Sequence, residues 1–121
     1  MSSSHDIKRQ EAQLRVLRHV AEHPDVSTRQ IADAVGISNG AAFYVLRALI
    51  DKGLVKSENF ARAERKSQYL YLLTPEGLAE KMRLTEKFIQ IKRMEYCALR
   101  AEVEALEDEF ARNGAQRQGG A

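Results

Sequence analysis

The chain has 121 residues, of which 44% are hydrophobic and 30% are charged, and its formal net charge is +2. This length fits one domain, or a small domain with a helical extension, and the recurring aliphatic residues argue against a disordered chain. A single cysteine, Cys97, excludes an internal disulfide framework and a cysteine-based zinc cluster. Because uncharged runs are too short to span a membrane and the N-terminus lacks a signal-peptide pattern, we expect a soluble, cytoplasmic protein.

The charges are unevenly distributed along the chain. Residues 36–73 contain six basic and three acidic residues, whereas residues 101–110 contain five acidic residues and no basic one. An anionic partner is therefore expected for the middle of the chain only.

The first predicted element is a helix over residues 7–22. Leu14, Leu17 and Ala21 form one apolar stripe along it, and basic residues lie outside this stripe. Pro24 ends the helix, because the residue before a proline is disfavoured in the helical conformation.

Two short helices follow with clear start and stop signals. Ser27 and the glutamine three residues later form a capping box for a helix over residues 27–35, and Gly36 is its expected left-handed end. A third helix begins at Ser38 and ends at Gly53. Two helices joined by so short a connection must cross steeply, which predicts a helix-turn-helix.

After the third helix the apolar period changes towards two. Residues 54–60 and 68–73 are predicted to be strands, and residues 61–66 form a basic tip between them. Such a hairpin beside a helix-turn-helix is a wing. Tyr71 and Leu72 point to opposite faces of the second strand, and we expect both faces to be covered.

The last predicted element is a long helix over residues 75–112, with Thr74 as N-cap and Pro75 in the first turn. Its apolar residues recur with the four-three spacing of a coiled coil. We call this set the seam; it consists of Leu78, Met82, Thr85, Ile89, Lys92, Tyr96, Leu99, Val103, Leu106 and Phe110. A helix of about 37 residues is roughly 55 Å long, so most of its seam needs another chain.

Two further features belong to this part of the chain. A short second stripe of Leu84, Phe88 and Ile91 lies where the seam is interrupted by Thr85 and Lys92, and we expect the helix to meet a winged domain there. Residues 113–121, beginning with Asn-Gly, are predicted to be a disordered tail.

Three segments of the sequence resemble the winged helix-turn-helix of MarR-type bacterial transcription regulators. They are Ser27-Thr-Arg-Gln-Ile-Ala-Asp-Ala-Val-Gly-Ile-Ser, Leu46-Arg-Ala-Leu-Ile-Asp-Lys-Gly-Leu-Val-Lys and Tyr71-Leu-Leu-Thr-Pro-Glu-Gly. The Thr-Pro-Glu-Gly-Leu start of the long helix is most similar to MarR-family regulators associated with exopolysaccharide genes. The resemblance implies a homodimer that binds double-stranded DNA. Family members usually carry a helix before the winged domain that helps to form the dimer. The given sequence begins almost directly with the first helix of the winged domain, so we expect the C-terminal helix to form the dimer interface.

The predicted architecture is thus mainly α with a small β-wing. It comprises a winged helix-turn-helix DNA-binding domain over residues 7–74, a dimerisation helix over residues 75–112 and the tail. The dimer interface is predicted from the apolar members of the seam, which are Leu78, Met82, Ile89, Tyr96, Leu99, Val103, Leu106 and Phe110.

The third helix carries the main DNA-binding prediction. Its inward stripe is Ala42, Val45, Leu46 and Leu49, so the opposite face enters the major groove. That face consists of Ser38, Asn39, Gly40, Phe43, Tyr44 and Arg47. The wing tip adds Arg62, Arg65 and Lys66 along phosphates or in the minor groove, and Arg29 and Lys56 are further candidates for phosphate contacts.

Two other patterns have simpler explanations. His19-Val-Ala-Glu-His23 matches the H-x-x-E-H pattern of some zinc peptidases, but it lies at the end of a helix in a chain too short for a catalytic domain. We therefore expect no metal, no cofactor and no enzyme activity. Cys97 is interpreted as a half-buried structural thiol, with a redox switch as the alternative.

One competing function and one question of assembly remain at this stage. A winged helix can also serve as a protein-interaction adaptor without specific DNA binding, and salt dependence of DNA binding distinguishes the two. An antiparallel coiled coil is favoured, because a parallel one would place Lys92 against its own copy; charges beside the seam do not decide between them. The sequence does not indicate which small-molecule effector, if any, the protein binds.

Overall fold

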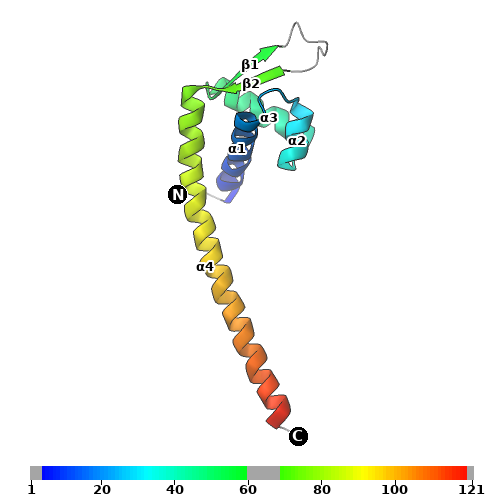
Figure 1. Cartoon of the computed structure of the whole chain (residues 1–121), viewed down its shortest axis with the longest axis vertical. Coiled ribbons are helices and arrows are strands. Elements are labelled where there is room, and N and C mark those ends of the chain that lie inside the picture. Colours follow the sequence, from blue (N-terminus) through cyan, green and yellow to red (C-terminus); the bar gives the residue numbers. More distant parts are fainter. Residues whose placement is uncertain (1–3, 60–68, 120–121) are drawn as a thin grey trace. The chain divides into compact units, whose positions relative to one another are not determined.

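The structure is a computed structural model that describes residues 4–59 and 69–119. In chain order its elements are α1 (Ser4–Glu22), α2 (Thr28–Val35), α3 (Asn39–Asp51), β1 (Val55–Asn59), β2 (Tyr69–Leu73) and α4 (Pro75–Gly119) (Figure 1). The predicted fold class is confirmed: the protein is mostly helical, with a two-stranded wing after a helix-turn-helix and a long C-terminal helix.

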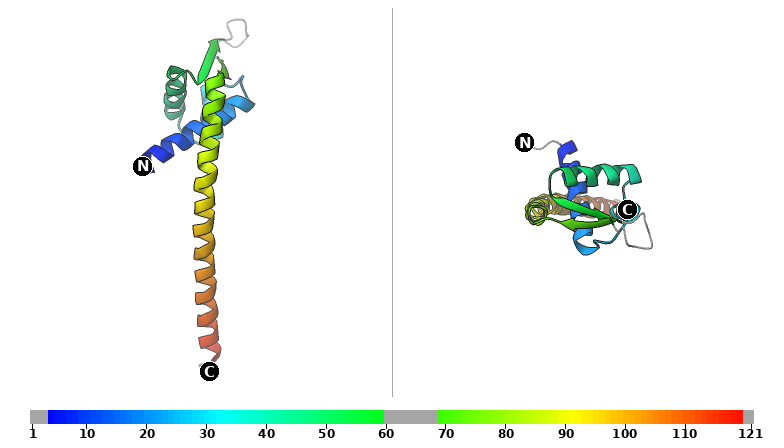
Figure 2. Two further views of the ribbon diagram at one scale, coloured as in Figure 1. Left: turned by 90° about the vertical axis from the view of Figure 1, so that its left-hand side faces the viewer. Right: turned by 90° about the horizontal axis from the view of Figure 1, so that it is seen from above.

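The chain forms two compact units, one ending at Glu86 and the other beginning at Lys87. In the first unit, Leu17 of α1, Ile31 of α2 and Leu49 of α3 are completely buried, and Figure 2 shows these helices gathered beside the hairpin. The first compact unit extends beyond residues 74 and 75, where the sequence analysis separated the DNA-binding domain from the dimerisation helix. The first turns of α4 belong to the winged unit, because Leu84 is only 1% exposed.

The predicted start and stop signals of the short helices are confirmed. The hydroxyl of Ser27 accepts a hydrogen bond from the backbone N–H of Gln30 at 3.2 Å, and the Gln30 side chain accepts one from the backbone N–H of Ser27 at 2.9 Å. Gly36 and Gly53 adopt φ values of 82° and 75°, the left-handed conformation that favours glycine. The first helix begins at Ser4, three residues earlier than predicted.

The wing is an antiparallel pair in which Val55 faces Leu73 and Asn59 faces Tyr69. Tyr71 is buried, whereas Leu72 on the other face is 36% exposed. The expectation that both faces of this strand are covered is therefore wrong at Leu72, since a two-stranded antiparallel sheet here packs only one face on the helices. The predicted wing tip at residues 61–66 lies outside the described residues.

Polar contacts attach the wing to the rest of the winged unit. The Tyr71 backbone N–H donates to the Pro24 carbonyl at 2.8 Å, and the Tyr71 hydroxyl lies 3.1 Å from that of Thr28. The first contact joins β2 to the segment between α1 and α2, and the second joins it to the first residue of α2. The position of the wing is thereby fixed relative to the helix-turn-helix.

The first turn of α4 is built on close backbone packing. The Thr74 hydroxyl accepts from the backbone N–H of Gly77 at 2.9 Å and lies 2.6 Å from the Gly53 carbonyl oxygen, to which it donates. A Cβ atom at Gly77 would lie 1.9 Å from the carbonyl oxygen of Leu54. Only glycine fits at position 77 without displacing this backbone.

The helix α4 continues beyond its predicted end at residue 112 and runs to Gly119. The Asn-Gly step at residues 113 and 114 does not stop it, because in the described part of the chain only Gly36 and Gly53 have positive φ values. A right-handed glycine inside a helix costs about 1 kcal/mol relative to alanine, which is too little to end a long helix. The prediction of a structureless segment from residue 113 is wrong as far as Gly119.

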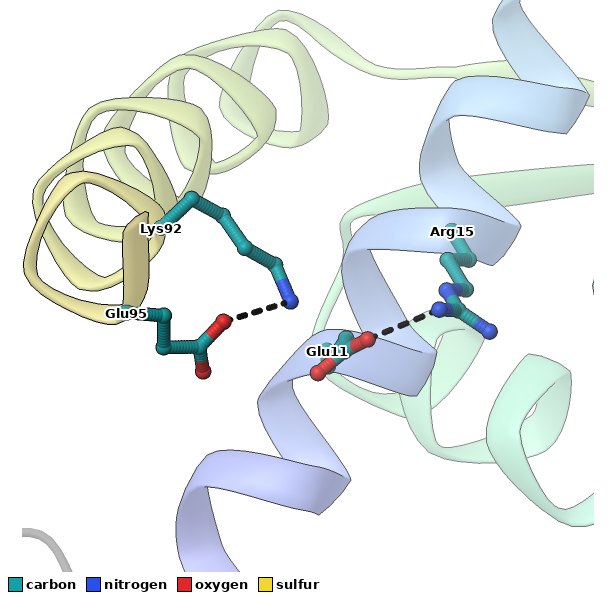
Figure 3. A network of polar contacts seen from close by, with 4 residues as sticks. All are labelled: Glu11, Arg15, Lys92 and Glu95. Atoms are coloured by element: carbon teal, nitrogen blue, oxygen red, sulfur yellow. Dashed lines mark hydrogen bonds and ion pairs between the residues drawn. The ribbon is translucent and has the colours of Figure 1, made fainter. Parts of the chain in front are cut away.

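The apolar members of the seam are exposed, from 45% at Ile89 and Val103 to 81% at Phe110. The second stripe differs, since Leu84 and Phe88 are buried. Ion pairs between residues three or four positions apart lie on the surfaces of the helices. Figure 3 shows one within α1, Arg15–Glu11 at 2.8 Å, and one within α4, Lys92–Glu95 at 3.3 Å.

Candidate nucleic-acid interface

The orientation of α3 is set by its buried stripe. Ala42, Leu46 and Leu49 are each 2% exposed or less, and Val45 beside them is partly buried. Their spacing of four and three residues places them on one side of the helix. The opposite side of α3 must therefore face outward.

The connection from α2 to α3 consists of Gly36, Ile37 and Ser38. The backbone N–H groups of Gly36 and Ile37 both donate to the carbonyl of Ala32, which closes the end of α2. The Ser38 hydroxyl accepts from the backbone N–H of Ala41 at 3.0 Å and starts α3. This tight turn places the first residues of α3 at the surface of the winged unit.

All six residues predicted on the outer side of α3 are exposed in the structure. Tyr44 is 74% exposed and Phe43 is 60% exposed, although large aromatic side chains are commonly buried. We call this surface the α3 outer face; it consists of Ser38, Asn39, Gly40, Phe43, Tyr44 and Arg47. It combines polar hydrogen-bonding groups, one cation and two aromatic rings.

No neighbour among the described residues requires glycine at position 40. A Cβ atom there would have no neighbour within 4 Å, and the residue does not have a positive φ. Glycine is less favourable than alanine inside a helix, so glycine at this position lowers the stability of α3 without improving its packing against the described residues. It leaves the backbone near the start of α3 open to a close approach from outside.

Two of the candidate cations have acidic neighbours that the sequence analysis did not identify. Arg47 Nε lies 3.8 Å from Asp51 Oδ1, and Lys56 Nζ lies 3.5 Å from Glu58 Oε1. The four-residue spacing of Arg47 and Asp51 on one helix was the available signal. Exposed pairs of this kind contribute little to stability, so both cations can exchange their partners for phosphate.

The remaining predicted residues are distributed over other parts of the winged unit. Arg29 is exposed in the first turn of α2, and Lys56 is exposed on β1. The structure thus presents cations from α2, α3 and β1. Arg62, Arg65 and Lys66 of the wing tip lie outside the described residues.

The two histidines of the H-x-x-E-H pattern lie close together at the end of α1. Their ring centroids are 4.8 Å apart, and the His23 backbone N–H donates to the His19 carbonyl. Partial burial lowers the pKa of His19, and the nearby His23 adds to this effect. No cluster of three potential metal ligands occurs among the described residues.

Cys97 is a free, exposed thiol on α4, so the interpretation as a half-buried thiol is wrong for the single chain. The neighbouring seam residue, Tyr96, is 64% exposed. Within the described part of the chain, no helix is sufficiently long and apolar to traverse a membrane.

Solved structures with this fold include known regulators. The PcaV transcriptional regulator from Streptomyces coelicolor is 23% identical, with 91% of this chain and 79% of that chain covered and a TM-score of 0.67. MarR from Staphylococcus aureus, in complex with salicylate and kanamycin, is 26% identical over 70% of this chain and 55% of that chain, with a TM-score of 0.55. A mutant MarR from E. coli in complex with operator DNA is 23% identical over 62% and 52% of the two chains, with a TM-score of 0.53.

No curated protein matches the chain. The family model described as "MarR family" matches residues 5–66, which is half of the chain and includes α1, α2, α3 and β1. The matched segment therefore contains the complete helix-turn-helix and the α3 outer face. The protein belongs to the MarR family.

Proposed function

We propose that the protein is a transcriptional regulator that binds specific sequences of double-stranded DNA as a homodimer. The observation that carries this proposal is the α3 outer face. It exposes two aromatic rings, an amide, a guanidinium group and an open glycine on the second helix of a helix-turn-helix. In this motif the second helix lies in the major groove with its first residues nearest the bases.

Four residues of the α3 outer face have a defined role against DNA. The Arg47 guanidinium can donate two hydrogen bonds to guanine or pair with a phosphate, and the Asn39 amide can pair with adenine. The Tyr44 hydroxyl can donate to a phosphate oxygen. Gly40 allows the backbone to approach the groove closely, because no side chain intervenes.

Cations outside α3 provide the sequence-independent part of the affinity. Arg29 and Lys56 are exposed on α2 and β1, and we assign them to phosphates on either side of the groove. The wing-tip residues Arg62, Arg65 and Lys66 extend this contact along the backbone or into the minor groove. Neutralising phosphates releases counterions, so binding weakens as salt concentration rises.

The alternative function is a protein-interaction adaptor. The exposure of Phe43 and Tyr44 is the observation that favours it, since aromatic residues are enriched at protein interfaces. The two functions differ in their response to salt. Binding to DNA weakens steeply between low and moderate salt, whereas an interface centred on two aromatic rings does not.

The test uses genomic fragments selected by the wild-type protein, with affinity measured by gel shift or fluorescence anisotropy. Arg47→Ala is expected to cost about 1–3 kcal/mol on the selected site, because it removes a bidentate base contact. Arg112→Ala removes the same charge from the distal part of α4 and is the matched control. Equal affinities of the two variants for the selected site would contradict the assignment of the α3 outer face.

The salt slope provides a second readout of the same experiment. Replacing Arg62 and Arg65 with alanine together is expected to lower affinity for all sequences and to reduce the slope by about two phosphate contacts. An unchanged salt slope would contradict the proposal that the wing tip contacts DNA.

We also propose that the target genes are related to exopolysaccharide production. This proposal is supported only by the resemblance of residues 74–78 to the corresponding segment of those regulators. Sequencing of the selected fragments tests it directly, and selected sites that lie only beside unrelated genes would contradict it.

A further inference from the structure

Eight of the twelve large hydrophobic side chains that the described chain leaves exposed belong to the seam of α4. Its eight apolar members are all at least 45% exposed, and contiguous apolar surface of this kind marks an interaction site. The strict four-three spacing fits a partner that is itself a helix with the same spacing. A second copy of this chain supplies such a helix, and the overall charge of the two halves of the seam region favours one direction.

The two halves of the seam region carry opposite charge. Residues 78–93 contain five basic and two acidic residues, whereas residues 95–110 contain one basic and six acidic residues. A parallel pair places like halves together, with +3 against +3 and −5 against −5. An antiparallel pair places the basic half of each helix against the acidic half of the other, and helix pairing follows such complementarity.

The seam residues favour the same direction. In a parallel pair Lys92 faces Lys92 of the second copy at a core position, where like charges are unfavourable. In an antiparallel pair each residue faces a different one. Lys92 already extends its ammonium group sideways to Glu95 of the same helix, at 3.3 Å (Figure 3), so only its aliphatic stem occupies the seam.

The register follows from the requirement that every seam residue has a partner. When two copies overlap over their complete seams, Leu78 faces Phe110, Ile89 faces Leu99 and Lys92 faces Tyr96 of the second copy. The other two pairs are Met82 with Leu106 and Thr85 with Val103. Both non-apolar members then meet a larger partner, and the Lys92 ammonium can lie over the Tyr96 ring or beside its hydroxyl.

The flanking charges agree with this register at its periphery. Antiparallel pairing brings Glu86 beside Arg100 and Lys81 beside Glu109 of the second copy, each twice per dimer. Near the centre it brings Arg93 beside its own copy and Glu95 beside its own copy, once each. The four attractive contacts outnumber the two repulsive ones, and Glu95 is already paired with Lys92. A parallel pair would have the same balance, so these flanking pairs are compatible with the register but do not select the direction.

We propose that the two α4 helices of the dimer form an antiparallel coiled coil in full register over Leu78–Phe110. This inference rests on the homodimer of the proposed function. The two-fold axis passes near Met94. The starts of the two α4 seams then lie about 48 Å apart, at 1.5 Å per residue. The DNA-binding units are joined to opposite ends of the coiled coil rather than side by side at one end.

Cysteine cross-linking tests the direction and register. In a Cys97→Ser background, Leu78→Cys and Phe110→Cys are made as separate variants, one with a larger affinity tag. Each alone is expected to give no disulfide-linked dimer, whereas mixing them after unfolding and refolding gives the linked heterodimer. Self-cross-linking of Leu78→Cys, or the absence of a linked heterodimer in the mixture, would overturn the proposal.

Charge reversal provides a second test that leaves the seam core unchanged. Glu86→Lys is expected to raise the dimer Kd roughly five- to thirty-fold, since two surface pairs are lost and two repulsions are gained. Adding Arg100→Glu restores the affinity if the pairing is antiparallel, whereas Lys81→Glu restores it if the pairing is parallel. Rescue by Lys81→Glu alone would overturn the antiparallel direction.

These outcomes separate the inference from the function on which it depends. DNA binding by the Cys97→Ser protein is measured in parallel with its mass by light scattering. Specific DNA binding with a parallel cross-linking pattern retains the proposed function and rejects the inference. A monomer that still binds its site rejects both the coiled coil and the homodimer.

Discussion

The winged unit and the distal part of α4 have similar apolar side chains but bury them differently. Up to Glu86, Leu17, Ile31 and Leu49 are completely buried by other parts of the same chain. Beyond Lys87, Leu99 and Leu106 are about as large, yet they are 60% and 58% exposed. Burial of apolar surface stabilises a fold by about 25 cal/mol per Å², so Leu99 and Leu106 obtain this stabilisation only from a partner.

The α3 outer face shows the same contrast on a smaller scale. Leu46 and Leu49 anchor α3 in the core, while Phe43 and Tyr44 one turn away are open. These two exposed surfaces of the described chain each lie along one side of a helix with regular spacing. In the proposed function, the chain divides its large apolar residues between an internal core and two surfaces that bind partners.

The largest expected effect concerns the seam. Leu99→Asp combined with Leu106→Asp places four carboxylates in the core of the dimer, where burying an unpaired charge is highly unfavourable. The dimer Kd is expected to rise more than about a thousand-fold, or 4 kcal/mol, and light scattering should detect a monomer with weaker DNA binding. The circular dichroism of the winged unit should be retained.

Ala101→Asp combined with Ala105→Asp is the matched control for that variant. It adds the same charge to the same helix, but at positions outside the seam. The control is expected to remain dimeric. If both double variants dimerise equally well, the distal helix does not bury its seam and the comparison between the two regions fails.

The local signals in the sequence predicted much of the fold because helix capping and helix termination depend on interactions between residues that are close along the chain. Ser27 capped its helix and Gly36 ended it, since each effect involves only a few neighbouring residues. Asn113-Gly114 misled because a glycine ends a helix only when it adopts the left-handed conformation, and Gly114 does not. The identity of a stop residue is thus weaker evidence than the conformation that the flanking chain imposes on it.

Non-local packing was predictable only in part. The spacing of the apolar residues in α3 predicted its buried stripe, so the residues of the α3 outer face could be predicted from the sequence as those on the opposite side. The exposure of Leu72 and the packing of Gly77 on Leu54 depend on segments that are distant along the chain. No local pattern reports such contacts, nor does one report that the first compact unit ends at Glu86.

A second prediction compares two glycines of α4. Gly77→Ala is expected to lower the free energy of unfolding by about 2–4 kcal/mol, because its Cβ would overlap the Leu54 backbone and force it to move. Gly114→Ala, in the same helix but with open space around it, should instead raise stability by up to about 1 kcal/mol. Urea unfolding measures both. Equal effects would show that the two ends of α4 are in similar environments.

The smallest expected effect concerns Gly40, the open glycine of the α3 outer face. Gly40→Ala should raise the free energy of unfolding by about 0.5–1 kcal/mol, since alanine is the better helix former and meets no neighbour within the chain. If the surface is open because DNA approaches it, the same methyl group should lower affinity for the selected site despite the gain in stability. Asp33→Ala, on the exposed side of α2, is a control for a gain in helix propensity elsewhere. A Gly40→Ala protein that is more stable and binds its site with unchanged affinity would show that the backbone at residue 40 lies away from the DNA.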